Sequence, residues 1–509
     1  MAATSHPLAT QAALEALHDG GTAADAAIAA VAVQSVVEPH MTGIGGDCFC
    51  LVAKPGAPVW GYNGSGRSAA AVSAEKLRAQ GIAAIGADSV HAITVPGAVD
   101  AWAAILKTHG RFGLDRALKP AIRYAEEGFP VAPRVAHDWA LGASRLRADP
   151  GASRHYLAAG QAPVVGDVMR FPALATSLKA IASYGARAFY DGEIAQDIAA
   201  TIAARGGFLA AADLAAHHGD EVAPIATNYR GLDVVELPPN GQGIVALVLL
   251  NILERFDLAG LDPSGAERFH IALEAARLAY AVRDTHIADP DFMRVQVASL
   301  LDKAFAAELA QRIDRERRVS LPTAPTPDSE TVCLTIVDRD RMAVSMVNTL
   351  YNSFGVGIAT EKTGILLQNR GMCFVLDPGH VNAIVPSKRP MNTIIPALAM
   401  RDGRCVLSFG VMGGHYQPAG HAQVITNLLD YGMDIQEAID APRAFFEGEK
   451  TVVERGMSSA TIDGLRARGH DVMLRALPLG GGQAIEIDWA RGVLTGGSDP
   501  RKDGCALGY

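Results

Sequence analysis

The chain changes character abruptly at residue 331, and this change limits how it can fold. Residues 316–330, ERRVSLPTAPTPDSE, are polar and rich in proline, which indicates a linker. The run TVCLTIVD alternates in hydrophobicity and predicts a half-buried strand over 331–338, followed by a DRDR turn and a second strand over 342–350. A two-stranded hairpin is marginally stable by itself. We therefore expect earlier strands to cover it, so that the linker does not separate two independent folds.

The remaining pattern alternates helices with strands. Periodicity, caps and breakers predict helices over 7–18, 22–38, 243–255, 266–286, 418–432 and 435–440. Further strands are predicted over 363–369, 396–400 and 403–409. Strands packed between layers of helices give an α+β architecture.

Composition excludes several classes of protein. The chain has 509 residues, 49% of them hydrophobic and 19% charged, as expected of a globular protein with a large core. Its net charge of −9 argues against a nucleic-acid partner. The N-terminus lacks the pattern of a signal peptide, and the longest uncharged helical stretch, 26–37, is too short to cross a bilayer. We therefore expect a cytoplasmic protein without a membrane partner.

Neither the cysteines nor the histidines are spaced as metal ligands. The six cysteines show no CxxC spacing, so the sequence predicts neither a zinc site nor a disulfide framework, and it indicates no cofactor. His415 and His421 are six residues apart and interrupted by Pro418, so they do not share one helical face. We expect His415 to line a site beside the preceding glycines and His421 to be a core or capping histidine. The cysteines are Cys48, Cys50, Cys333, Cys373, Cys405 and Cys505.

The seam at Thr331 suggests a specific chemistry. A threonine hydroxyl is a weak nucleophile unless a base takes its proton, and a free α-amino group on the same residue is one such base. Its ordinary pKa of about 7.7–8.0 suits that task near neutral pH. The chain would have to be cut between Glu330 and Thr331, through attack of the Thr331 hydroxyl on the Glu330 carbonyl. The alternative is that Thr331 is simply a β-forming residue at the start of a strand.

Two further features fit a nucleophile at this position. Thr349 lies at the end of the predicted return strand, where it would be able to hydrogen-bond the Thr331 hydroxyl. Gly413 and Gly414 follow a predicted strand directly, and their consecutive N–H groups would suit an oxyanion hole. The pattern leaves open whether this glycine pair is only a turn.

Several long segments, in order, resemble the γ-glutamyltransferase family of N-terminal nucleophile hydrolases. They include HPLATQAALEALHDGGTAADAAIAAVAVQSVVEPHMTGIGGD, LPPNGQG, GILLQNRG, PSKRPMNTIIP, VMGGHYQPAGHAQV and GGSDPRKDGCALGY. The resemblance implies a four-layer αββα sandwich and autocleavage into a large subunit (1–330) and a small catalytic subunit (331–509), which stay together. It also implies that Thr331 is the nucleophile, that Thr349 supports it, and that Gly413 and Gly414 form the oxyanion hole.

The chain departs from the family where γ-glutamyl enzymes recognise their donor. Asn63 stands where the arginine for the α-carboxylate belongs, and Arg67 is four residues further on. The positions that hold the α-ammonium carry Tyr351, Arg370 and Cys373, and the serine pair near the carboxylate becomes Asn392–Thr393. An ammonium would then meet no carboxylate and would face Arg370, at a cost of several kcal/mol. Arg370 would instead suit a substrate carboxylate, unless it is a structural ion-pair residue.

These observations rank three functions. The first is an autoprocessing threonine amidohydrolase that acts on a small amide with a carboxylate near the scissile carbonyl, as in the family branches that hydrolyse oxamate or glutaryl and cephalosporin-type side chains. The second is a genuine γ-glutamyl transpeptidase or glutathione hydrolase. The third is an uncleaved, non-catalytic relative. The sequence leaves open hydrolysis against transfer to an acceptor, and whether the processed heterodimer pairs into a homodimer.

Overall fold

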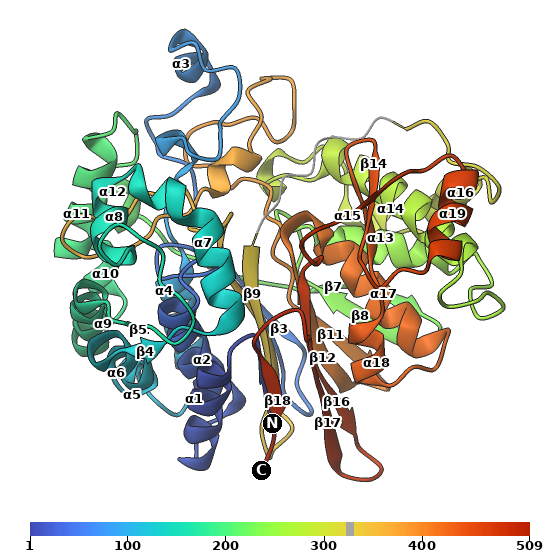
Figure 1. The fold of residues 1–509 in the computed structure, drawn as a ribbon, viewed down its shortest axis with the longest axis horizontal. Helices are drawn as coiled ribbons and strands as arrows, with labels where there is room; N and C mark the ends of the chain where they lie inside the picture. The colour runs from blue at the N-terminus through green and yellow to red at the C-terminus, as the bar shows by residue number, and fades with distance from the viewer. Residues whose placement is uncertain (322–329) are drawn as a thin grey trace.

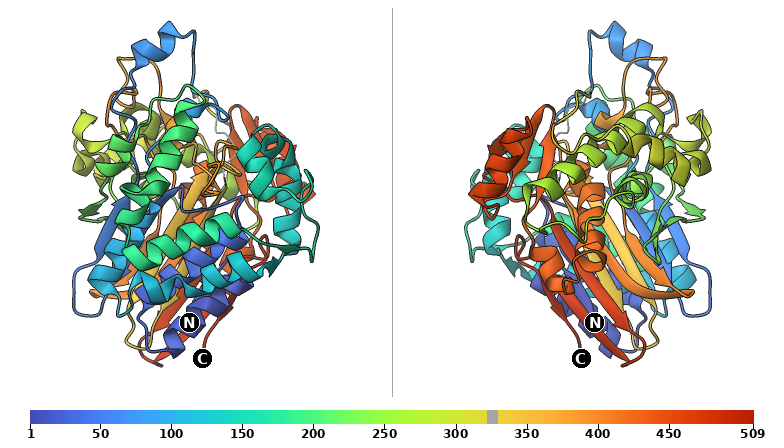
Figure 2. Two further views of the ribbon diagram at one scale, coloured as in Figure 1. Left: turned by 90° about the vertical axis from the view of Figure 1, so that its left-hand side faces the viewer. Right: turned by 90° about the vertical axis from the view of Figure 1, so that its right-hand side faces the viewer.

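The structure, a computed structural model, describes residues 1–321 and 330–509. Residues 322–329 of the predicted linker lie outside the described residues. In Figure 1 two sheets stand side by side in the middle of the molecule, with one set of helices to the left and another to the right. The two side views in Figure 2 look onto each helical layer in turn. This arrangement is the four-layer αββα sandwich and confirms the predicted α+β class.

The first sheet has seven strands and the second has six. The order in the first is β18 (Cys505–Leu507), β1 (Ala2–Thr4), β9 (Glu330–Val337), β10 (Ala343–Tyr351), β2 (Asp47–Ala53), β3 (Trp60–Gly64) and β6 (Asp220–Val222). The order in the second is β17 (Val493–Ser498), β16 (Gly481–Asp488), β12 (Arg404–Met412), β11 (Ala397–Arg401), β8 (Leu232–Glu236) and β7 (Ile225–Tyr229). The neighbours in both sheets pair antiparallel.

Helices cover the outer face of each sheet. The set beside the first sheet comprises α1 (Pro7–His18), α2 (Ala23–Val37), α4 (Ala98–His109), α5 (Leu114–Ala117), α6 (Lys119–Glu127), α7 (Pro133–Arg147), α8 (Pro150–Tyr156), α9 (Pro172–Tyr184), α10 (Arg187–Tyr190), α11 (Glu193–Ala203) and α12 (Ala211–Ala215). The set beside the second comprises α13 (Gly243–Leu253), α14 (Ala266–His286), α15 (Val297–Leu300), α16 (Lys303–Ala310), α17 (Gln417–Leu429), α18 (Ile435–Asp440) and α19 (Ser459–Ala467). Helix α3 (Ala74–Ala79) projects from the top of this view.

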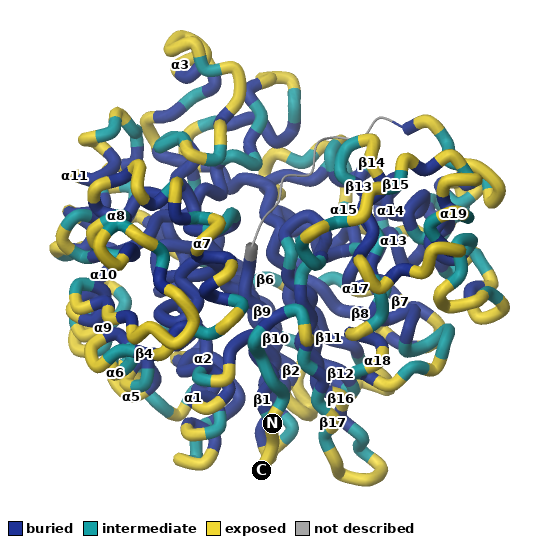
Figure 3. Tube along the Cα trace, viewed as in Figure 1, coloured by how far each residue is buried: buried dark blue, intermediate teal, exposed yellow. Residues whose placement is uncertain are grey.

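The central hairpin is buried on both faces, so the prediction of half-buried strands is wrong. Val332 and Val347 belong to an apolar cluster between the two sheets, whereas Leu334 and Met346 belong to the cluster under the first helical layer. Both faces of β9 and β10 therefore pack against protein, and Figure 3 shows the middle of the molecule as buried. Alternate side chains of these strands therefore point into two different apolar clusters, and neither face of the hairpin meets solvent.

The predicted strand over 363–369 is also wrong. The backbone N–H groups of this segment donate to scattered acceptors instead of to one neighbouring strand: Leu367 to the carbonyl of Ile358, Gln368 to Gly45 and Asn369 to Leu350. The segment passes along several loops instead of one strand, and an apolar run alone does not distinguish that path from a sheet strand.

The two sheets mix strands from both sides of residue 331. The first sheet takes β1, β2, β3 and β6 from before this residue and β9, β10 and β18 from after it, and the second is mixed in the same way. The two termini meet where β1 pairs with β18 (Figure 1). The part of the chain described here contains no helix that is both long enough and apolar enough to span a membrane.

The N-terminus of α2, which packs under β9, gives a first prediction. Asp25 is buried, and its carboxylate accepts hydrogen bonds from the N–H groups of Thr22 (2.8 Å), Arg111 (2.9 Å) and Phe112 (2.9 Å). Asp25→Ala leaves these donors without an acceptor, so we expect a loss of about 3 kcal/mol in unfolding free energy, measured by urea denaturation. The exposed cap Asp434 of α18 is the control, for which Asp434→Ala should cost only about 1 kcal/mol. Equal losses in both variants would contradict the prediction.

Candidate functional site

Thr331 lies opposite an irregularity in the pairing of β9 with β10. Asn348 pairs with Val332 and Tyr351 with Glu330, so Thr349 and Leu350 together oppose Thr331 alone. Such a bulge redirects side chains. The hydroxyl oxygens of Thr331 and Thr349 lie 3.3 Å apart, and the Thr349 oxygen also accepts a hydrogen bond from the N–H of Tyr351 (2.8 Å). The structure thus brings these two threonines together in a buried position, as the hairpin predicted.

The glycine pair forms a tight turn at the end of β12, before a short 3-10 helix (Gly414–Tyr416). Gly413 has φ +117° and Gly414 φ +54°, and a Cβ on Gly413 would lie 2.8 Å from the Cα of Gly480. Only glycine fits this backbone without strain. Among the described residues, no oxygen accepts a hydrogen bond from the N–H of Gly413 or Gly414. Both donors are therefore available to a bound group.

His415 links this turn to the central hairpin. Its Nδ1 lies 2.8 Å from Nη1 of Arg283, and its Nε2 lies 3.0 Å from the hydroxyl of Tyr351. An arginine only donates, so Nδ1 must accept and Nε2 must carry the hydrogen, which it donates to Tyr351. Burial, and then the positive charges of Arg283 and Arg370, hold the pKa of His415 well below its usual range. His415 is thus a neutral imidazole with one tautomer.

Gln242, the residue before α13, holds the glycine turn through hydrogen bonds. Its Nε2 donates to the carbonyl oxygens of Gly414 and Thr393, both at 2.8 Å, and its Oε1 accepts from Arg283 at 3.0 Å. The hydroxyl of Tyr280 on α14 donates to the carbonyl of His415. The turn is therefore fixed by three buried side chains from the segment before residue 331.

Arg370 begins a short 3-10 helix (Arg370–Cys373) and is fully buried. Its Nη1 donates to the hydroxyl of Thr393 (2.9 Å) and lies 3.8 Å from the sulfur of Cys373, and its guanidinium carbon lies 4.0 Å from the ring centroid of Tyr351. Within the described chain, Nε and Nη2 have no hydrogen-bond partner. These two nitrogens form one edge of the guanidinium, and such an edge binds a carboxylate through two parallel bonds.

Asp47, at the start of β2, corrects one expectation. The sequence predicts no carboxylate near Arg370, but Oδ2 of Asp47 lies 3.9 Å from its Nε. This contact is an ion pair by distance but is too long for a hydrogen bond. Burial raises the pKa of Asp47 to about 6, although Arg370 and the donors around the carboxylate oppose the shift.

Asn63 and Asn392, which the sequence also placed at the recognition site, form hydrogen bonds with neighbouring side chains of the protein. Asn63 donates to the side-chain oxygen of Asn240 (2.8 Å) and accepts from Ser65, and Asn392 donates to Asp47 (3.1 Å). Arg67 lies apart from Arg370 and forms an ion pair with Asp220 at 3.7 Å.

His421 is a core residue, as expected. Its Nε2 accepts from the N–H of Val411 on β12 (3.1 Å), and its Nδ1 lies 2.7 Å from the carboxylate of Glu236. The residue is fully buried. Its contacts support the strand that ends at the glycine turn.

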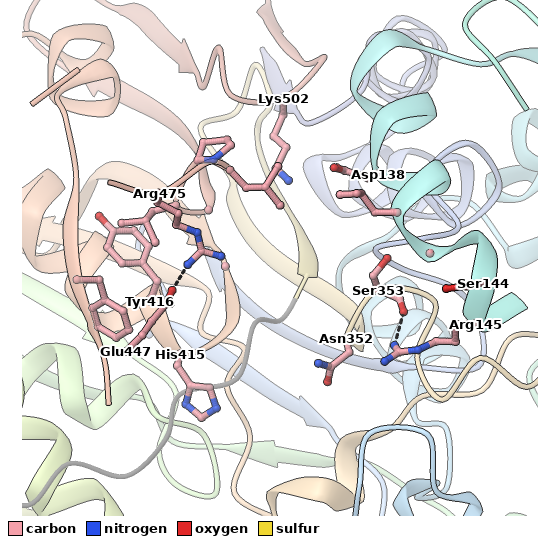
Figure 4. Close-up of a pocket in the computed structure, with 18 of the residues that line it drawn as sticks. Asp138, Ser144, Arg145, Asn352, Ser353, His415, Tyr416, Glu447, Arg475 and Lys502 are labelled. Atoms are coloured by element: carbon pink, nitrogen blue, oxygen red, sulfur yellow. Dashed lines mark hydrogen bonds and ion pairs between the residues drawn. The ribbon is translucent and has the colours of Figure 1, made fainter. Parts of the chain in front are cut away.

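A cleft of about 630 Å³ opens beside the glycine turn. Figure 4 shows Arg475 and Glu447, an ion pair, on one wall and Arg145 on the opposite wall, where it donates to the carbonyl of Ser353. Its lining includes Asn352, which follows Thr349 closely in the chain. It also includes Gly413 and His415 of the glycine turn, and His415 contacts Tyr351. A volume of this size suits a small organic molecule.

Sequence reasoning missed four polar residues of the site: Asp47, Gln242, Arg283 and Gln368. Asp47, Gln242 and Gln368 lie in segments that are otherwise mainly apolar or glycine-rich, MTGIGGDCF, LPPNGQG and GILLQNRG, whereas Arg283 is followed by the polar residues DTH. A buried polar residue in such a segment must find partners, and that was the available signal. The partners themselves come from distant segments and are visible only in the fold.

Comparisons with known proteins agree with this fold. A family model described as gamma-glutamyltranspeptidase matches residues 9–509. The chain is 39% identical over 520 residues to the glutathione hydrolase-like YwrD proenzyme of Bacillus subtilis (strain 168). It is 37% identical over 525 residues to the oxamate amidohydrolase proenzyme of Klebsiella pneumoniae. Each alignment covers 100% of this chain and 98% of the relative. The crystal structure of cephalosporin acylase from Bacillus halodurans matches with a TM-score of 0.94 and 39% identity, over 100% of this chain and 96% of that one.

The contact between Arg283 and His415 gives a second prediction. Arg283→Met removes a positive charge and the donor to Nδ1, so we expect the pKa of His415 to rise by about one unit or more. The imidazole ¹⁵N shifts of His415, followed by NMR against pH, measure the change. Arg294, whose guanidinium donates to the carbonyl of Gly379 on the surface, provides the control variant Arg294→Met. An unchanged His415 titration in Arg283→Met would contradict the tautomer assignment.

Proposed function

This chain belongs to the gamma-glutamyltranspeptidase family, and we propose that it is an autoprocessing threonine amidohydrolase for small amides that carry a carboxylate. The observation that carries the proposal is the buried pair of Thr331 and Thr349, which meets at the bulge where β9 begins. The names of relatives, which include proenzymes of an amidohydrolase and an acylase, support the reaction class.

Self-cleavage comes first in this proposal. The Thr331 hydroxyl loses its proton and attacks the carbonyl carbon of Glu330, the amide nitrogen takes up a proton, and the C–N bond breaks to leave an ester. Breaking the C–N bond frees the α-amine of Thr331. Water then attacks the ester carbonyl and breaks its C–O bond, which restores the Thr331 hydroxyl and leaves Glu330 with a C-terminal carboxylate. The hydrogen bond between the two threonines orients the hydroxyl, and the β-methyl limits its rotamers. The products are subunits of residues 1–330 and 331–509, held together because both contribute strands to each sheet.

Amide hydrolysis then uses the freed amine as the base. The amine takes the hydroxyl proton as the oxygen attacks the substrate carbonyl, and the same proton passes to the leaving nitrogen as the C–N bond breaks. Water hydrolyses the resulting acyl-enzyme on Thr331, with the amine again accepting a proton. The N–H groups of Gly413 and Gly414, which have no acceptor among the described residues, suit the negative charge that develops on the carbonyl oxygen. The cleft beside them has room for a small-molecule amide.

The substrate preference rests on Arg370. Its open Nε–Nη2 edge suits a carboxylate close to the scissile carbonyl, and the stacked Tyr351 holds the guanidinium in place. Thr393 fixes the opposite side of the guanidinium, and His415 fixes the Tyr351 hydroxyl. Asn392 contributes by donating a hydrogen bond to Asp47. Asn63 stands where γ-glutamyl enzymes of the family have an arginine.

A second function, glutathione hydrolysis, is favoured by one observation. Asp47 supplies a carboxylate near Arg370 that an α-ammonium could in principle approach. However, the N–H of Gly66 and the side chains of Gln368 and Asn392 already donate to this carboxylate, and Arg370 is its nearest cation. An ammonium would therefore bring a second positive charge next to a buried guanidinium, which costs free energy.

The nucleophile gives a third prediction. We expect Thr331→Ala to remain a single full-length band after long incubation and to have no amidase activity, because it lacks the attacking hydroxyl. Thr331→Ser keeps a hydroxyl and should still be cut, although more slowly. N-terminal sequencing of the small fragment of the wild type should read Thr-Val-Cys-Leu. Cleavage of Thr331→Ala at the same bond would rule out self-cleavage by this residue.

Arg370 gives a fourth prediction. Arg370→Met removes a bidentate, charge-assisted contact of about 2–3 kcal/mol, so KM for an acidic amide such as oxamate should rise about 100-fold. KM for a neutral amide should change by about threefold or less. Arg67→Met, at the partly exposed arginine four residues beyond Asn63, is the matched control. Robust turnover of glutathione or a γ-glutamyl anilide by the wild type, with equal effects on acidic and neutral amides in Arg370→Met, would favour the second function.

A further inference from the structure

The place of Asp47 beside Arg370 raises a question of charge. The proposed carboxylate site is the Nε–Nη2 edge of Arg370, and Oδ2 of Asp47 lies 3.9 Å from Nε on that edge. Both residues are fully buried. A substrate carboxylate bound there would place two negative charges around one guanidinium, away from water. A net buried charge of this kind is strongly unfavourable.

Asp47 cannot easily turn away from this position. Its Oδ1 accepts from the N–H of Gly66 (3.1 Å) and from Nε2 of Gln368 (2.9 Å), and its Oδ2 accepts from Nδ2 of Asn392 (3.1 Å). The residue also begins β2 and pairs with Thr349, so its backbone is part of the central sheet. The conflict between the two carboxylates is therefore relieved by a proton rather than by movement.

The surroundings decide which carboxylate takes the proton. Burial already raises the pKa of Asp47 to about 6, whereas a carboxylic acid in water has an ordinary pKa of about 4. Oδ1 already accepts two hydrogen bonds, but Oδ2 has one and faces Arg370. A hydrogen on Oδ2 can then be donated to the substrate carboxylate, as in paired carboxyl groups that share one proton.

We propose that Asp47 takes up a proton from solvent when a substrate carboxylate binds to Arg370, and that the neutral Asp47 donates a hydrogen bond to that carboxylate. This inference rests on the carboxylate site of the proposed function. Asp47 is thus a specificity-determining residue, because it admits a carboxylate only together with a proton. An ammonium group would conflict with the Arg370 guanidinium instead, and a proton on Asp47 would not relieve that conflict.

After the proposed cleavage, the α-amine of Thr331 also titrates near neutral pH, and it belongs to the residue beside Thr349, which pairs with Asp47 in the sheet. Asp47→Asn keeps this amine, so that variant separates proton uptake at Asp47 from uptake at the amine. The thiol of Cys48 and the hydroxyl of Tyr190 also interact with the charge of Asp47. Burial raises the pKa of both groups above their usual ranges, so both keep their protons throughout the neutral range and neither changes charge. Neither group therefore supplies the proton that Asp47 takes up.

The sign of the pH dependence follows from these pKa values. Below about pH 6 Asp47 is already protonated in the free protein, so the affinity for a carboxylate is constant. Above pH 6 each binding event takes up a proton, and the affinity falls by up to about tenfold per pH unit until the pKa of the complex is reached. Neutral ligands should show no such slope.

Calorimetry on the processed wild-type protein tests the proposal. Oxalate, succinate and glutarate are titrated as probes at pH 7.5 in phosphate and in Tris, which differ in ionisation enthalpy. The buffer difference should give an uptake of about one proton per bound dicarboxylate, and the affinity should fall about tenfold between pH 7 and 8. Asp47→Asn should abolish both effects. Asp338→Asn, at another buried carboxyl with a raised pKa in the β9–β10 turn, should keep them.

The outcomes separate this inference from the proposed function. Dicarboxylate binding that is lost in Arg370→Met but involves no proton uptake in the wild type overturns the role of Asp47 alone. An unchanged pH slope in Asp47→Asn overturns it as well, and if that variant does not fold, the wild-type proton count decides. If no dicarboxylate binds and Arg370→Met leaves KM for acidic amides unchanged, both the carboxylate site and the role of Asp47 fall.

Discussion

The pairing of β9 with β10 is the interaction on which the rest of the structure depends. This hairpin lies in the middle of the first sheet and packs against the second sheet and the α2 layer at once. Its one irregularity opposes Thr331 with Thr349 and Leu350, and the N–H of Tyr351 is satisfied by the Thr349 hydroxyl. The regular hydrogen-bond ladder makes the hairpin rigid, and the bulge places the Thr349 hydroxyl next to that of Thr331.

A second constraint is the buried charge around Arg370. A guanidinium without exposure must have compensation, and here it comes from Thr393, the face of Tyr351 and a carboxylate at 3.9 Å. None of these satisfies the Nε–Nη2 edge. A structural ion pair would ordinarily use that edge, and this incomplete pairing of Arg370 with Asp47 is the feature on which the proposed carboxylate site rests.

The fold of this family does not by itself decide the substrate. The relatives share most of the chain length but carry names as different as glutathione hydrolase, oxamate amidohydrolase and acylase. The buried scaffold that holds the glycine turn, with Gln242 and Arg283 at its centre, serves the reaction rather than the specificity. In the function proposed here, specificity depends on a few side chains beside it, chiefly Arg370 and Asp47.

Local sequence pattern was sufficient to predict the class of fold, the helices α1, α2, α13, α14, α17 and α18, the central hairpin and the proximity of Thr331 and Thr349, because these depend on periodicity and short-range pairing. It did not predict that β9 and β10 are buried on both faces, nor that 363–369 lies outside the sheets. Only the tertiary structure brought Asp47 to Arg370 and Arg283 to His415, since their separations in sequence are 323 and 132 residues. Charges and hydrogen bonds act through space, so residues far apart in the chain acquired their chemical character only when the sheets and helices packed together.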